Sequence, residues 1–105
     1  MKPLFALLLC LGVVTSSTAF AAMSSQQRTD FTASCQRQMY MSKGECACMA
    51  DIADKTLDEA AITYLSLDAL DVKHSAAMAK TMTAAEIHSI DHFMQTAPKT
   101  CKGAT

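Results

Sequence analysis

His88 and His92 have the spacing of a candidate metal site, with Asp91 beside His92. On a helix, residues four apart can present two imidazoles to one metal ion. The apolar residues of the segment fall on the other side of the helical wheel, so both histidines should face solvent. The glutamate that a zinc-protease helix carries is missing. This favours two exposed polar side chains, and the alternative is a surface clamp completed by Asp91 or by a partner's ligand.

Cys46 and Cys48 form a second close pair, separated by Ala47 alone. Thiol-redox enzymes normally place two residues between their cysteines, and the Cys-x-x-Cys-His motif of covalent haem is absent. Two further cysteines, Cys35 and Cys101, are available to form bridges. We therefore interpret Cys46 and Cys48 as structural disulfide cysteines. A metal-binding pair and a redox pair are the alternatives.

Methionine is frequent, with 8 in 105 residues. Its thioether is a soft copper ligand, but it also fills irregular cores and lines adaptable binding grooves. The helical pattern directs four methionines inward: Met39, Met49, Met78 and Met94. Core packing is the favoured interpretation. The alternatives are an adaptable groove for a partner, and a copper site that combines His88, His92 and methionine sulfur.

The first residues have the layout of a secretory leader. Lys2 precedes an apolar run from Leu4 to Val14, and Ala19 and Ala21 fit the small positions of a cleavage site. We expect cleavage after Ala21, giving a leader over 1–21 and one domain over 22–105. The apolar run is shorter than the roughly 20 residues of a membrane span. The expected product is periplasmic or secreted, with no membrane span after cleavage.

Four cysteines in so short an exported domain predict two disulfides. A bridge between Cys46 and Cys48 would close a strained ring, and on a helix their side chains point nearly opposite ways. One should therefore bond Cys35 and the other Cys101. A helical hairpin about residues 42–43 places Cys35 opposite residue 50. This favours Cys35–Cys48 and Cys46–Cys101, while the exchanged pairing stays open.

Helices must position these residues, because between residues 22 and 97 there is no proline and one glycine, Gly44. No alternating apolar and polar stretch is long enough to predict a strand. Capping pairs predict helix starts at Ser24 with Gln27 and at Thr83 with Glu86. The fold class that we expect is all-α, a small compact bundle of four or five short helices stapled by two disulfides.

The other helices are expected over about 45–55, from about residue 58, and over about 71–80. Pro98 should end the last helix. Apolar residues at helical spacing give the expected core: Phe31, Cys35, Met39, Cys46, Met49, Ala50, Ala53, Leu57, Ile62, Leu65, Leu70, Met78, Ile87, Ile90, Phe93, Met94 and Ala97.

Charge is nearly balanced, with 9 basic and 10 acidic residues. No basic stripe is present, which argues against nucleic acid as a partner. Acidic residues concentrate between residues 45 and 71, and a solvated helix face is the ordinary interpretation. The alternative is a docking surface for a basic protein. Its candidate contacts are Asp51, Asp54, Asp58 and Glu59.

The sequence contains no nucleophile elbow, glycine-rich phosphate loop or suitably spaced acid pair. We therefore expect neither an enzyme nor a bound cofactor. The expected function is protein–protein binding by an exported helical domain, such as an inhibitor or immunity factor, a chaperone or an accessory subunit of an envelope system. A periplasmic copper-binding protein is the alternative. A thiol-redox protein that uses Cys46 and Cys48 is the second.

Overall fold

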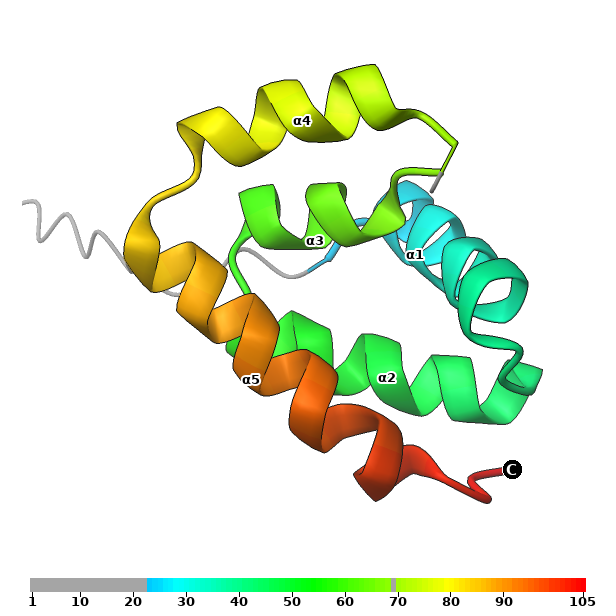
Figure 1. Ribbon diagram of the computed structural model, residues 1–105. Helices are drawn as coiled ribbons and strands as arrows, with labels where there is room; N and C mark the ends of the chain where they lie inside the picture. Colours follow the sequence, from blue (N-terminus) through cyan, green and yellow to red (C-terminus); the bar gives the residue numbers. More distant parts are fainter. Residues whose placement is uncertain (1–22, 69) are drawn as a thin grey trace, which may run out of the picture.

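Five helices form the described part of the chain, residues 23–68 and 70–105 of a computed structural model (Figure 1). They are α1 (Ser25–Met39), α2 (Lys43–Thr56), α3 (Glu59–Ser66), α4 (Val72–Thr81) and α5 (Ala84–Cys101). One disulfide joins α1 to α2 and a second joins α2 to α5. The predicted all-α, disulfide-stapled fold is confirmed, while the expected leader over 1–21 lies outside the described residues.

Polar side chains at the N-termini determine where the helices begin. The predicted capping boxes of α1 and α5 are both present: Ser24 with Gln27, and Thr83 with Glu86. Aspartates cap α3 and α4 through side chains that accept backbone N–H hydrogen bonds, Asp58 from Ala61 and Asp71 from His74. Each cap satisfies a donor that the first helical turn leaves without an intrahelical partner.

Helix α2 begins two residues earlier than expected. Ser42 is its N-cap and accepts from the N–H of Glu45, whose carboxylate accepts from the N–H of Ser42. From the sequence, the hairpin turn was expected about residues 42–43 and the helix start near residue 45, although Ser42 and Glu45 have capping-box spacing. The turn itself is shorter, and it begins at Tyr40 in a left-handed conformation with φ 54°.

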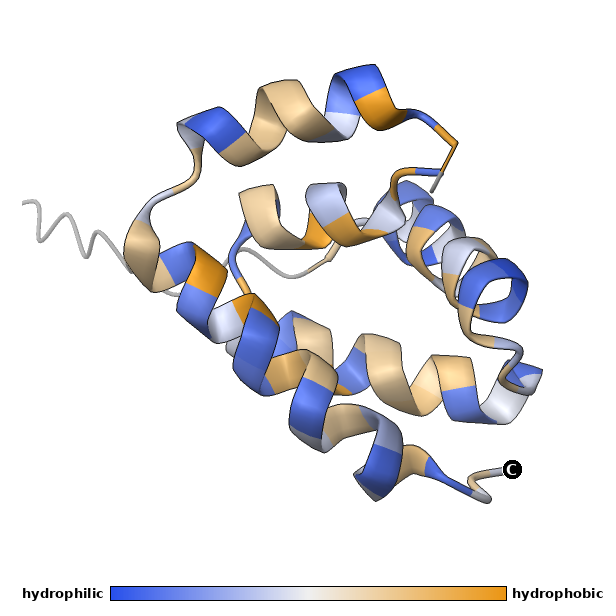
Figure 2. Ribbon diagram, viewed as in Figure 1, coloured by the Kyte–Doolittle hydropathy of each residue, from blue (hydrophilic) through white to orange (hydrophobic). Residues whose placement is uncertain are grey.

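The core forms where α2 packs against α1 on one side and α5 on the other, with α3 packed on α1 and α5. One face of α2 is fully buried, and it carries Cys46, Met49, Ala50 and Ala53. Phe31 and Phe93 meet edge to face, with ring centroids 6.2 Å apart. Residues of α1, α2, α3 and α5 together make up the buried core, and hydrophobic residues alternate with hydrophilic ones along these helices (Figure 2).

Helix α4 packs mainly against α3 and has no buried residue (Figure 1). Met78 was expected in the core, but it is only half-buried and lies outside the core cluster. Leu70 was also expected in the core, but it is exposed, as is Val72 at the start of α4. The helical spacing was right, but among the described helices α3 is the main neighbour that covers the apolar face of α4.

Two expectations for α5 are wrong in detail. Ile87 and Met94 were placed in the core, but their side chains are exposed, at 45% and 39%. Pro98 does not end α5, which continues to Cys101. A proline removes one N–H bond of the last turn, but the bond from Cys101 to Cys48 fixes that turn against α2. Among the described residues, no helix is long and apolar enough to cross a membrane.

Candidate binding sites

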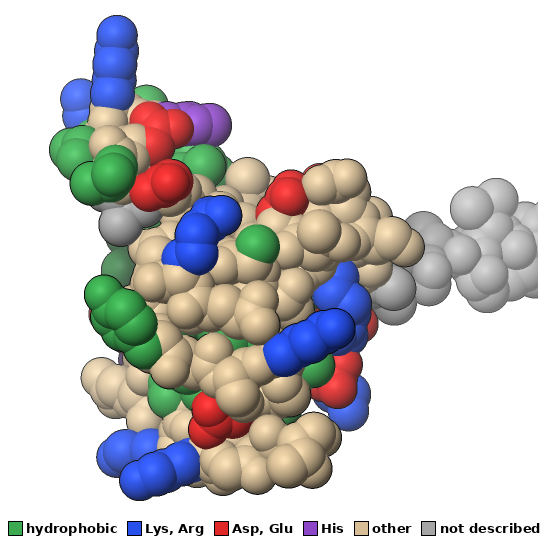
Figure 3. Space-filling view, turned by 90° about the vertical axis from the view of Figure 1, so that its right-hand side faces the viewer, with side chains coloured by type: hydrophobic (Ala, Val, Ile, Leu, Met, Phe, Trp, Pro, Cys, Tyr) green, Lys and Arg blue, Asp and Glu red, His purple; other side chains and the backbone are tan. Residues whose placement is uncertain are grey.

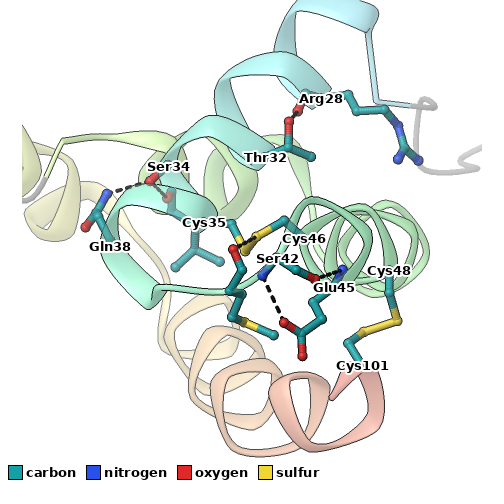
Figure 4. Close-up of a disulfide and its surroundings, with 12 residues drawn as sticks. Arg28, Thr32, Ser34, Cys35, Gln38, Ser42, Glu45, Cys46, Cys48 and Cys101 are labelled. Carbon is teal, nitrogen blue, oxygen red and sulfur yellow. Dashed lines mark hydrogen bonds between the residues drawn. A yellow bond between two sulfur atoms is a disulfide. The ribbon is translucent and has the colours of Figure 1, made fainter. Parts of the chain in front are cut away.

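The disulfides join Cys35 to Cys46 and Cys48 to Cys101, with Cα–Cα distances of 5.8 and 5.6 Å (Figure 4). The favoured pairing of Cys35 with Cys48 and Cys46 with Cys101 is therefore wrong. Because α1 ends at Met39 and α2 begins at Lys43, the residue opposite Cys35 is close to 47 and not 50.

The direction in which each side chain points around α2 then determines whether Cys46 or Cys48 bonds Cys35. Cys46 lies on the buried face that meets α1, whereas Cys48 points about 200° away from it, toward the end of α5. The consequence for redox chemistry is direct. Cys46 and Cys48 have different partners, and the sulfur atoms of Cys46 and Cys101 belong to fully buried residues. The close pair is thus not a dithiol poised to cycle.

The methionines Met39, Met49 and Met94 come together around a small apolar pocket of about 90 Å³. Helices α1, α2, α3 and α5 all contribute to its lining. The other lining residues are Phe31, Ser34, Cys35, Gln38, Leu65 and Phe93. Three of the seven methionines that follow the expected leader thus share one site, which the helical pattern treated as separate core positions.

Two polar side chains fix the α1–α3 edge of this pocket. The Ser34 hydroxyl donates to the carbonyl of Leu65 at 3.1 Å, and the Gln38 amide donates to the carbonyl of Leu67 at 2.8 Å and to Ser34 Oγ (Figure 4). These bonds satisfy carbonyls at the end of α3, where intrahelical donors run out. Sequence reasoning missed both residues; the spacing of four between them was the only available signal.

His88 and His92 are exposed on α5, as expected, and line one open groove of about 350 Å³ between α5 and α2. Phe93 lines both this groove and the methionine pocket, so its ring lies between them. The expected copper set is therefore divided, with imidazoles on one side and thioethers on the other. Asp91 does not line the groove, and the described residues include no group of three or more His, Cys, Asp or Glu suited to a metal ion.

The acidic residues proposed as a docking surface are mostly engaged within the chain. Asp51 pairs with Arg28, Asp54 accepts the N–H of Met23, and Asp58 caps α3. Glu59 lies exposed in the first turn of α3. On the face shown in Figure 3, acidic and basic side chains are scattered and do not gather by sign. Recognition of a basic protein by these residues stays a prediction.

Hydrogen bonds at two helix starts perturb carboxyl groups. The N–H of Ser42, and after it that of Gly103, lower the pKa of Glu45 below its ordinary value. The N–H of Thr83 likewise lowers the pKa of Glu86. In both cases the backbone donors favour the charged carboxylate. These shifts belong to helix capping, and they identify neither a general acid nor a general base.

Similarity to known proteins assigns none of these sites. The sequence matches no family model, and no curated protein or solved structure is significantly similar to the chain.

Proposed function

We propose that this protein is an exported binding module that receives an apolar side chain of a partner protein in its methionine pocket. The observation that carries the proposal is the pocket's size and lining. At about 90 Å³ it is smaller than the ~300–1,000 Å³ of typical small-molecule sites. It is also smaller than an apolar cavity of ~150 Å³ that admits benzene. One aliphatic side chain is an occupant of suitable size.

The lining supports an adaptable contact. Methionine is unbranched and polarisable, so it adjusts to differently shaped side chains. Met94 is 39% exposed, whereas Met49 at the base is fully buried. The pocket therefore has a partly exposed methionine at its opening and a fully buried one at its floor. The hydrogen bonds of Ser34 and Gln38 hold its α1–α3 edge in place.

Export is the second part of the proposal. The two disulfides are compatible with an oxidising compartment, where such bonds persist. The expected leader predicts a mature N-terminus at Ala22, which N-terminal sequencing of the protein from the periplasmic or secreted fraction would check. A protein found in the cytosol with its first 21 residues attached would contradict this part.

Site-specific photo-crosslinking tests the pocket. A photoreactive amino acid is placed at Met94 or at Met39 on the pocket, and at the exposed Ala47 of α2 as a control outside the lining. The proposal expects an adduct of the same mass from both pocket positions in cells and none from position 47. Adducts that form equally at position 47, or at none of the three, would overturn it.

A charge at the opening gives an independent check. Met94→Glu should abolish the adduct from position 39, because an apolar side chain cannot enter beside a carboxylate without desolvating it. Since Met94 is partly exposed, we expect the variant to keep its helical circular dichroism. Met94→Leu is the matched control and should retain the adduct. An adduct that persists in the folded Met94→Glu variant would contradict the pocket as the contact site.

A further inference from the structure

The groove that contains His88 and His92 is separate from the methionine pocket and has a different chemistry. Its lining is completed by Ile52 and Thr56 of α2 and by Ser89, Phe93 and Thr96 of α5. The two imidazoles are the only ionisable side chains among these residues, and no methionine or cysteine is included. The groove therefore offers two nitrogen ligands, hydroxyl groups and space for water.

The two histidines are held on one side of a well-anchored helix. Residues four apart on a helix have Cβ atoms ~5–6 Å apart, which allows both imidazoles to reach one ion. Ile90 and Ala97 are buried on the opposite side of α5, and Cys101 bonds its last turn to α2. Ligands placed on such a rigid element need little ordering when a metal binds.

The imidazoles are also available. Among the described residues, the only histidine within 4.0 Å of a carboxylate is His74, whose partner is Asp71. His88 and His92 are exposed and need no rearrangement of the core to present a ring nitrogen. Within the described part of the chain, His88 and His92 are therefore neither buried nor ion-paired, so both rings are free to bind a metal ion.

We propose that His88 and His92 form a two-imidazole chelate for a divalent late transition metal, with Cu²⁺ bound most tightly. Imidazole suits copper, nickel and zinc, and the affinity of a given site for divalent ions generally peaks at Cu²⁺. Monovalent copper, which prefers sulfur, is not the expected ion because the thioethers lie across Phe93. The remaining coordination positions are filled by water or by a ligand from a bound protein.

Titration of Cu²⁺ into the purified, disulfide-bonded protein tests the site, using calorimetry for affinity and electron paramagnetic resonance for the ligands. One ion should bind per chain, with a spectrum that shows two imidazole nitrogens. His88→Ala and His92→Ala should each weaken binding by roughly tenfold or more, because even outer-shell partners of a metal are worth ~10–100-fold. His74→Ala, which removes an exposed histidine of α4, should leave the affinity unchanged.

Three results would overturn the proposal. Affinity that is the same in His88→Ala and His92→Ala as in the parent would place the copper elsewhere, such as at the chain's amino terminus. A loss of copper affinity in His74→Ala as large as that in His88→Ala or His92→Ala would show that copper binds surface histidines non-specifically. A spectrum with a single imidazole nitrogen would exclude the chelate. Circular dichroism of each variant verifies the fold, and because these side chains are exposed we expect it to be unchanged.

Discussion

Gly44, the second residue of α2, lies directly under the C-terminal residues of the chain. A Cβ atom at this position would come within 2.7 Å of the carbonyl oxygen of Ala104 and 2.8 Å of the Cα of Thr105. The N–H of Gly103 donates to the Glu45 carboxylate at 2.8 Å and fixes the approach of the tail. Gly44 is therefore required by the close contact of two backbone segments.

Substitution of Gly44 can distinguish the effect of this contact on stability from the effect of helix propensity. Alanine is normally better than glycine inside a helix by ~0.5–1 kcal/mol, but in the complete chain the added methyl group must displace the tail. When Ala104 and Thr105 are deleted, we expect Gly44→Ala to raise the free energy of unfolding by ~0.5–1 kcal/mol. In the full chain, we expect the same substitution to leave the free energy of unfolding unchanged or to lower it. Urea unfolding of the four proteins measures this, and equal effects in both backgrounds would refute the contact.

Glu45 predicts a definite pH dependence of stability. Its pKa is lowered in the folded state by the N–H of Ser42 first and that of Gly103 next. A lowered folded pKa contributes stability that is present above the ordinary value and lost as the pH falls through the folded pKa. Glu45→Gln should therefore flatten the decline in unfolding free energy between roughly pH 5 and pH 3.

A matched variant separates charge from capping. Ser42→Ala removes the cap hydroxyl and should cost ~0.5–2 kcal/mol at neutral pH, while the Ser42 N–H still contacts Glu45. Its stability curve should be lower than the parent's and should keep most of the decline toward acid. A parent and a Glu45→Gln variant with parallel curves would show that this carboxylate is not selectively stabilised.

At the scale of helices, the starts governed by short-range chemistry were predictable. Ser24 with Gln27 and Thr83 with Glu86 act within one turn, so their sequence spacing is sufficient. The end of α5, by contrast, could not be predicted from nearby residues. A proline such as Pro98 normally stops a helix, but the bond from Cys101 to Cys48 holds the last turn of α5. Local helix propensity contains no information about this long-range bond. The buried face of α2 was predictable as well. A helix that packs between two neighbours needs a broad apolar face, and the sequence shows that face directly in its spacing of apolar residues.

The sequence does not predict which apolar helix faces are buried by a neighbouring helix. Met49 and Met78 were both expected in the core, yet Met49 is fully buried between helices and Met78 is only half-buried on α4. Coverage depends on how many helices pack against an element, which is a property of the tertiary arrangement. Which residues share the methionine pocket and which share the histidine groove could not be predicted for the same reason, because each site combines residues from more than one helix.

This difference gives a test at the level of the elements. Met49→Ala should lower the free energy of unfolding by ~2–5 kcal/mol, because it leaves a cavity in a closed core. Met78→Ala should cost within about 0.5 kcal/mol, as a substitution at a loosely covered surface does. Chemical denaturation measures both. A large cost for Met78→Ala would mean that α4 is packed more tightly than its burial indicates.

For the whole molecule, the disulfides join α1, α2 and α5 into one covalent unit. Their sequence separations are 11 for Cys35–Cys46 and 53 for Cys48–Cys101. Since a longer loop loses more conformational entropy when it is closed, the second bridge should contribute more stability. The actual pairing could not be obtained from spacing alone, because both candidates for Cys35 lie within one helical turn of each other.

Removing each bridge in turn measures its contribution. From chain entropy, Cys35→Ala with Cys46→Ala should cost about 3 kcal/mol, and Cys48→Ala with Cys101→Ala about 4 kcal/mol. Thermal unfolding of the two double variants gives the ranking, and peptide mapping without reduction identifies the pairs. A peptide that links Cys35 to Cys48 would contradict the described pairing, and a reversed ranking would contradict the entropic account.

The Cys48–Cys101 bridge also affects how the chain would respond to proteolysis. Helices α3 and α4 lie wholly between these two cysteines, so they belong to a covalently closed loop. Helix α4 has no buried residue and does not line the methionine pocket. A protease that cuts once within α4 would therefore produce a nicked molecule whose two pieces stay joined through sulfur, with the helices that form the pocket still attached to one another.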